Sequence, residues 1–305
     1  MSVQETAPTA EVALRRHILP TELGPCTVRV QQGTTGQPRG SGTPDVYLHG
    51  AAGSWTTFRP LISGSLTDDR VLVDLPGWGE STRSARLENF SIEAMARAVT
   101  DVLKSLGYRQ WHLVGHSMGG FLALHIAAAC PERTASVAAI SATTFGVSEA
   151  AREPLRSLPR FPAFVGMLLV MRLMASIGRA GPALVRAVGT TPVMRPLMSP
   201  FFAAPAAISA TVIRGLGDDA RPASFSVAAR AAAGYDFGQW TTIRCPVLAL
   251  RGDADVFSPP SDLIRLAKVV PHAQLVTIPL CGHFANVEHP AQVQRILRDW
   301  RSGYQ

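Results

Sequence analysis

The chain has 305 residues, of which 47% are hydrophobic and 17% are charged. This composition excludes a disordered chain and predicts a large buried core, in one large α/β domain or in two domains. The formal net charge is +7, but the basic residues are almost all Arg and form no dense run, so we expect no nucleic-acid partner.

Short apolar runs alternate with helical patterns along most of the chain. In chain order, we predict strands over 45–49 and 71–75, a helix over 91–106, a strand over 111–115, a helix over 119–130, strands over 137–141, 246–251 and 274–278, and a helix over 290–300. The strands are apolar throughout, which is typical of strands covered on both faces. The alternation predicts a mostly parallel central sheet that is flanked by helices.

Residues 146–235 break this alternation. They contain no convincing strand, and they hold five of the eight Met, nine of the 23 Pro, and ten Arg against four acidic residues. We predict a helical cap over 146–235, inserted into an α/β core that comprises residues 1–145 and 236–305. The apolar helices of such a cap either line a pocket or pack as core, and the pattern does not separate the two.

The cysteines and the apolar stretches limit the compartment and the cofactors. The four cysteines are far apart and form no C-x-x-C pair, so we expect reduced thiols and no metal site. Residues 1–20 include acidic side chains and no apolar centre, and therefore do not resemble a signal peptide. Residues 161–177 form the longest apolar stretch, which is shorter than the roughly 20 residues of a membrane span. We expect a cytoplasmic protein without stable membrane insertion.

The segment from Gly115 to Gly119 (GHSMG) fits the pattern G-x-S-x-G. It lies between a predicted strand and an apolar helix, where a serine on a sharp turn projects toward backbone N–H groups at the helix start. Ser117 is therefore the candidate nucleophile, and the alternative is a serine that only caps the helix.

A serine nucleophile needs a base, and the base needs a carboxylate. His283 follows the last predicted strand, at the sheet edge where ligands bind in open α/β folds. His49 and His116 lie in loops that flank the same place. Asp253 and Asp255 both follow the strand over 246–251, and either carboxylate could orient the histidine.

Acyl transfer also needs donors for an oxyanion. The segment HGAAGSW over 49–55 follows a predicted strand, and its glycines allow close approach of the backbone. The N–H groups of Ala51 and Met118 would form a two-donor oxyanion hole. A plain tight turn is the alternative interpretation of this segment.

Five motifs, HGAAGSW, DLPGWGES, GHSMGG, GDADVFSPP and CGHFANVEHP, occur in this order. With them the chain resembles the α/β-hydrolase superfamily, in the group that carries a cap after the sixth strand. In that family the acid of G-x-x-D-x-x-x-P is catalytic, which places the role on Asp255. The resemblance thus implies the catalytic set Ser117, Asp255 and His283. Candidate pocket residues are His49, Trp55, Trp78, His116 and Phe284. The Gly-rich stretch 33–43 departs from the usual early hairpin, so the second strand is not assigned.

The resemblance implies a cofactor-independent serine hydrolase that cleaves an ester or related acyl bond of a small, mostly apolar molecule. Epoxide hydrolases and haloalkane dehalogenases carry Asp at the elbow, and Ser117 excludes both. Carbon–carbon bond hydrolases, which usually have Asn in place of His116, and perhydrolases or acyltransferases remain alternatives on the same triad. A non-catalytic ligand-binding protein is the alternative from another class. The sequence leaves the substrate and the oligomeric state open.

Overall fold

The computed structural model describes residues 14–34, 40, 42–62 and 67–304. An eight-stranded sheet forms its centre, in the order β1-β2-β4-β3-β5-β6-β7-β8. The strands are β1 (Arg15–Thr21), β2 (Gly24–Gln31), β3 (Asp45–Leu48), β4 (Arg70–Val73), β5 (Trp111–His116), β6 (Thr134–Ile140), β7 (Val247–Gly252) and β8 (Gln274–Ile278). The pairs β1·β2 and β2·β4 are antiparallel and the other five pairs are parallel. The predicted fold class, a mostly parallel sheet flanked by helices, is confirmed.

Twelve helices surround the sheet within the described ranges. They are α1 (Ile92–Ser105), α2 (Met118–Ala129), α3 (Phe145–Arg152), α4 (Pro154–Ser157), α5 (Pro162–Ser176), α6 (Ala180–Gly189), α7 (Met194–Leu197), α8 (Ala210–Asp218), α9 (Pro222–Ala233), α10 (Pro260–Val269), α11 (Ala285–Glu288) and α12 (Pro290–Ser302). Short 3-10 turns are η1 (Trp55–Phe58), η2 (Leu87–Asn89), η3 (Ser199–Phe201), η4 (Pro205–Ala207) and η5 (Phe237–Thr242).

The sequence patterns located β3 to β8 well and missed the first two strands. Ser91 caps α1, since its side chain accepts a hydrogen bond from the N–H of Ala94, and Gly107 follows the helix at φ +98°. The strands β1 and β2 were not predicted. β1 is an edge strand with a half-exposed, polar sequence, and in β2 apolar residues alternate with polar ones, so neither forms an apolar run. Of the Gly-rich stretch 33–43, residues 35–39 and 41 lie outside the described residues. Helix α10 was also missed.

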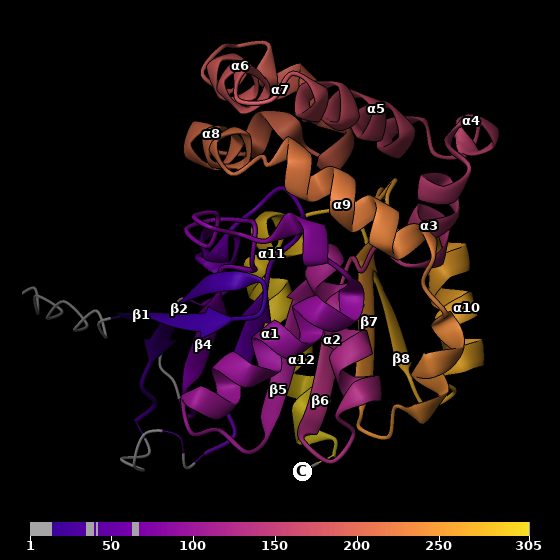
Figure 1. Ribbon diagram of the computed structural model, residues 1–305. Helices are drawn as coiled ribbons and strands as arrows, with labels where there is room; N and C mark the ends of the chain where they lie inside the picture. The colour runs from indigo at the N-terminus through magenta and orange to yellow at the C-terminus, as the bar shows by residue number, and fades with distance from the viewer. Residues whose placement is uncertain (1–13, 35–39, 41, 63–66, 305) are drawn as a thin grey trace, which may run out of the picture.

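Apolar side chains alternate between the two faces of the sheet. On β3, Val46 and Leu48 join a core with α1 and α2, whereas Tyr47 joins a second core with Val293 and Leu297 of α12. Each central strand is therefore covered on both faces, which explains its continuous apolar run. Helices α1 and α2 cover one face and α12 the other (Figure 1).

Helices α3 to α9 all lie between β6 and β7 in the chain. They are stacked above the carboxyl ends of the parallel strands, with α5, α6 and α7 farthest from the sheet (Figure 1). We refer to α3–α9 as the cap. Helix α9 packs on α5 and α3, and it lies below α5 in the view of Figure 1. No helix in the described residues is long and apolar enough to cross a membrane.

Candidate active site

Ser117 sits in a strained turn between β5 and α2. Its φ of +54° and ψ of −120° lie where residues with a side chain are rarely found. The turn is tight, because a Cβ on Gly119 would come within 1.9 Å of the Leu48 carbonyl oxygen, and one on Gly115 within 2.2 Å of the Gly119 carbonyl oxygen. The N–H of Ser117 donates to the carbonyl of Ile140 at 2.9 Å. The two glycines of the motif are therefore steric requirements of this turn.

Three side chains that are far apart in the sequence form a hydrogen-bonded row. The Nε2 of His283 lies 2.9 Å from the hydroxyl oxygen of Ser117. The Nδ1 of the same ring lies 3.0 and 3.1 Å from the two carboxylate oxygens of Asp255. All three residues are buried. With Nδ1–H donating to Asp255, Nε2 is free to accept the proton of the Ser117 hydroxyl.

Asp255 is held by its own loop as well as by the imidazole. Its Oδ1 accepts hydrogen bonds from the N–H groups of Phe257 at 2.8 Å and Ser258 at 3.1 Å. Burial acts to raise the pKa of Asp255, but the charge and hydrogen bond of His283 and the Phe257 N–H outweigh it, so the pKa lies below its usual range. The carboxylate therefore stays ionised at neutral pH.

Asp253, the other aspartate of this loop, faces elsewhere. Its Oδ1 accepts from the N–H of Cys281 at 3.2 Å. Backbone N–H groups of Cys281 and Leu280 lower the pKa of Asp253. Asp253 thus ties the loop after β7 to the loop after β8 and does not contact the imidazole.

His116 supports the same loop from the neighbouring strand end. Its Nε2 lies 2.9 Å from the carbonyl oxygen of His283 and must donate to it, which leaves Nδ1 as an acceptor. Burial lowers the pKa of His116 to about 3, so the ring is neutral. Its Nδ1 is buried and has no hydrogen-bond partner within the described residues. His116 therefore brings an open acceptor, and no charge, to the site.

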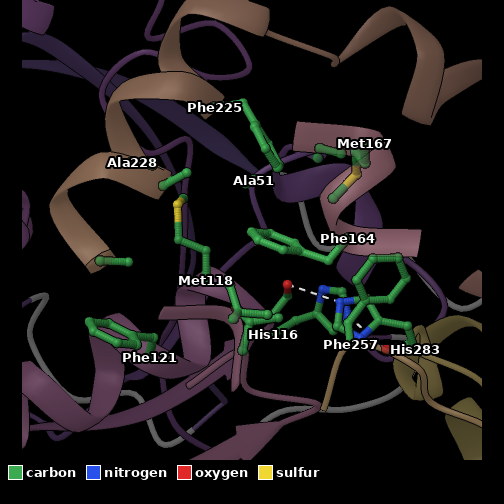
Figure 2. Close-up of a pocket in the computed structure, with 18 of the residues that line it drawn as sticks. Ala51, His116, Met118, Phe121, Phe164, Met167, Phe225, Ala228, Phe257 and His283 are labelled. Carbon is green, nitrogen blue, oxygen red and sulfur yellow. Dashed lines mark hydrogen bonds between the residues drawn. The ribbon is translucent and has the colours of Figure 1, made fainter. Parts of the chain in front are cut away.

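Ser117 lines an apolar cavity, and Figure 2 shows part of the lining of this cavity. Five polar side chains line it: Thr57, His116, Ser117, Thr143 and His283. The remaining lining residues are glycine or apolar: Gly50, Ala51, Ala52, Gly53, Ile92, Met118, Phe121, Val147, Phe164, Met167, Phe201, Phe225, Ala228, Ala229, Ala232, Phe257 and Phe284. Among the described residues, no Asp, Glu, Lys, Arg or Tyr lines this cavity. The upper wall of the cavity consists of Phe164 and Met167 of α5 and Phe225 of α9, which lie opposite Met118 and Phe121 of α2 (Figure 2).

Of the candidate pocket residues, His116 and Phe284 line the cavity, as do the oxyanion candidates Ala51 and Met118. His49, however, does not line it. It is fully buried, its Nε2 accepts from the Leu75 N–H at 3.0 Å, and burial lowers its pKa. His49 is a core residue that fixes the turn after β4.

Trp55 and Trp78, the other two candidate pocket residues, are not among the residues that line this cavity. Trp78 is fully buried, and its indole N–H donates to the carbonyl of Ala51 at 2.6 Å, which supports the proposed oxyanion loop from behind. The ring of Trp55 contacts the guanidinium groups of Arg29 and Arg59, at 4.4 and 4.7 Å from their carbon atoms. Both side chains therefore have partners outside the cavity lining.

Several aromatic lining residues were missed from the sequence. Phe257 lies in the motif GDADVFSPP, and its ring stacks on Phe201 with centroids 4.6 Å apart. Phe257 and Phe201 also approach the His283 ring, at 4.9 and 6.3 Å. The backbone carbonyl of Phe201 accepts from the N–H of His283 at 2.7 Å, so the cap contacts the histidine loop directly. Proximity to Asp255 could have indicated Phe257, whereas nothing in the sequence distinguished Phe201 from other cap residues.

Comparisons with known proteins agree with this architecture. Residues 46–295 match the model of the alpha/beta hydrolase family. The chain is 26% identical over 291 residues to bifunctional epoxide hydrolase 2 of Sus scrofa, covering 86% of this chain and 52% of the relative. It is 28% identical over 267 residues to a 2-hydroxy-6-oxononadienedioate/2-hydroxy-6-oxononatrienedioate hydrolase of Paraburkholderia phymatum, covering 84% and 85%. The chain thus spans only about half the length of the pig relative.

A solved structure of a thermophilic esterase from Thermogutta terrifontis superposes with a TM-score of 0.71 at 22% identity. It covers 95% of this chain and 98% of that one. At this identity, the likeness shows the shared fold.

Proposed function

This chain belongs to the alpha/beta hydrolase family, and from its site we propose that it is a serine hydrolase. The substrate is a small, mostly apolar molecule with an ester or related acyl bond. The observation that carries the proposal is the hydrogen-bonded row of Ser117, His283 and Asp255 at the base of an apolar cavity.

The proposed reaction proceeds through an acyl-enzyme. The Ser117 oxygen attacks the ester carbonyl carbon while Nε2 of His283 takes the hydroxyl proton. The carbonyl oxygen becomes an oxyanion, which the N–H groups of Ala51 and Met118 stabilise. The tetrahedral intermediate then collapses, and the leaving alcohol takes the proton from His283.

Water completes the cycle. It attacks the acyl carbon and gives a proton to His283, and the second intermediate releases the carboxylic acid as Ser117 regains its proton. Asp255 stabilises the imidazolium in both halves of the cycle. Each step uses these side chains and water, so the proposed reaction needs no cofactor and no metal.

The lining of the cavity favours an uncharged acyl group. The Paraburkholderia relative is named for a dioate, a substrate with two carboxylates. Burial of a carboxylate without a cationic partner is costly, and no Lys or Arg lines the cavity within the described residues. We therefore favour a neutral ester over a carbon–carbon bond in a dicarboxylate.

The reaction for which the epoxide hydrolase relatives are named does not fit this site either. In that reaction a carboxylate attacks the epoxide carbon, whereas the nucleophile position here is Ser117. Ring opening also needs an acid near the epoxide oxygen, and the described cavity lining contains no Tyr, Asp or Glu. An acyl-enzyme on Ser117 is the intermediate that this site fits.

A fluorophosphonate probe and a series of p-nitrophenyl esters test the proposal. The probe should label Ser117, and Ser117→Ala should lose at least about three orders of magnitude in kcat while it remains folded. Ser148→Ala is the matched control, since Ser148 is a buried cap serine whose hydroxyl has no partner in the described residues and does not line the cavity. Unchanged turnover in Ser117→Ala, or labelling of another residue, would contradict the mechanism. Absence of both labelling and turnover would favour a non-catalytic binding protein.

A further inference from the structure

Most of the large apolar side chains that are exposed to solvent among the described residues lie in the cap. Fourteen such side chains are exposed among the described residues, and nine of them lie within 155–197. The nine are Leu155, Leu158, Leu169, Val170, Leu173, Ile177, Leu184, Val193 and Leu197. They belong to α4–α7 and the adjoining turns, and α5, α6 and α7 form the layer farthest from the sheet (Figure 1).

Helix α5 is apolar on both sides. Phe164 and Met167 line the cavity, and Leu168 is fully buried beside them. The opposite side presents Leu169, Val170, Leu173 and the capping residue Ile177, with exposed fractions of 46, 52, 59 and 45%. Their spacing of i, i+1, i+4 and i+8 places them on one helical face. We call these four residues the outer face of α5.

A helix that is apolar all round is normally covered on all sides. Nothing within the described residues covers the outer face of α5, so its composition points to an apolar surface outside the molecule. The helix has 15 residues and is too short to span a bilayer, which requires about 20. Contact of its exposed face with the surface of a membrane is the arrangement that this length allows.

The charge of the cap identifies the kind of surface. Residues 154–217 carry seven Arg and no Asp, Glu or Lys. Arg172 and Arg179 flank the outer face of α5, are exposed, and form no ion pair within the described residues. A second copy of the chain would bring these unpaired cations against one another. An anionic surface would neutralise them.

We propose that the outer cap docks on an anionic membrane surface through the outer face of α5 and the arginines around it. The cap rests there with the outer face of α5 in the headgroup region and the α/β core in water. This arrangement does not depend on which bond the site cleaves.

Vesicle co-sedimentation tests the docking directly. The wild-type protein should bind vesicles of phosphatidylcholine and phosphatidylglycerol at least about tenfold better than vesicles of phosphatidylcholine alone, with weaker binding at high salt. A variant that combines Leu169→Gln, Leu173→Gln and Ile177→Gln should lose about tenfold or more of that binding. The matched control combines Ile264→Gln and Leu275→Gln, which are equally exposed side chains on α10 and β8. This control should bind as the wild type does.

A second pair of variants separates charge from folding. Arg172→Gln with Arg179→Gln should weaken binding to anionic vesicles, whereas Arg295→Gln with Arg298→Gln, two exposed positions on α12, should not. Thermal unfolding checks that all variants are folded. Equal binding to neutral and anionic vesicles, or full binding by the triple glutamine variant, would overturn the proposal. A dimer that dissociates in the triple variant would also overturn it, because the outer face would then be occupied by a second copy.

Discussion

Replacement of Asp255 by Asn tests the proposed mechanism at a single atom. In the wild type, Oδ1 is held by the N–H groups of Phe257 and Ser258. Both carboxylate oxygens face Nδ1 of His283, Oδ1 at 3.0 Å and Oδ2 at 3.1 Å. In Asp255→Asn those two N–H groups retain the amide oxygen, so the amide NH₂ takes the place of Oδ2. Its hydrogen then faces Nδ1, which favours the tautomer with the ring proton on Nε2. The base that faces Ser117 is thereby lost.

The expected effect is large on turnover and small on binding. Loss of the correct tautomer lowers kcat in serine triads by about four orders of magnitude, which corresponds to about 5.5 kcal/mol in the barrier. KM should change little, because Asp255 does not line the cavity. The fold should be retained, since Asn keeps the two backbone hydrogen bonds of the loop.

Steady-state hydrolysis of a p-nitrophenyl ester, with kcat and KM determined separately, measures this effect. Asp253→Asn is the control in the same loop, since Asp253 is exposed and binds the Cys281 N–H instead of the imidazole. It should keep kcat within a few fold. A large loss in Asp253→Asn with near-normal turnover in Asp255→Asn would refute the assignment.

Three further results are expected. Gly119→Ala should unfold or severely destabilise the protein, because the new Cβ meets the Leu48 carbonyl. In Gly166→Ala on α5 the new Cβ meets nothing within 4 Å, so this variant should raise the free energy of unfolding in urea by about 0.5–1 kcal/mol. The free energy of unfolding should fall as the pH decreases below about 6.5, since buried His116, with a pKa of about 3, binds its proton only in the unfolded chain. This histidine contributes up to about 1.4 kcal/mol per pH unit. A free energy of unfolding that does not change over this pH range would contradict the neutral state of His116. Across esters of increasing acyl length, kcat/KM should rise about fourfold per buried methylene, at about 0.8 kcal/mol each, until the cavity is full. A maximum of kcat/KM at acetate would show that the apolar lining does not bind the acyl chain.

The central sheet and the triad loops could be predicted because their signals are local. Strands such as β5 and β7 are buried on both faces and appear as apolar runs, and the steric needs of the elbow fix Gly115 and Gly119 in the sequence. The edge strand β1 could not be found in this way, whereas the other edge strand, β8, was predicted from its sequence. β1 has exposed and half-exposed residues and a polar composition, so no run marks it.

The missed strand β2 also explains why Trp55 was expected at the pocket. The ring is held by Arg29, which lies on the unpredicted strand β2 and pairs with buried Asp74. Without β2, nothing in the sequence indicated a partner for the indole outside the pocket. The direction of a side chain in a loop depends on such tertiary partners, whereas the position of the loop follows from the strand before it.

The apolar composition of the cap was ambiguous for a different reason, because one helix has several apolar faces. On α5, helical phase alone separates Phe164 and Met167, which line the cavity, from Leu169 and Leu173, which face outward.

If the outer face docks on lipid as proposed, the cavity wall of the same helix lies next to the membrane, and esters dissolved in a bilayer reach Ser117 by a short path. Arg172→Gln with Arg179→Gln should therefore slow hydrolysis of an ester carried in anionic vesicles while leaving the rate on a water-soluble ester unchanged, since neither arginine lines the cavity. Equal loss on both substrates would mean that these arginines act on the site itself, and the link between docking and substrate supply would fail.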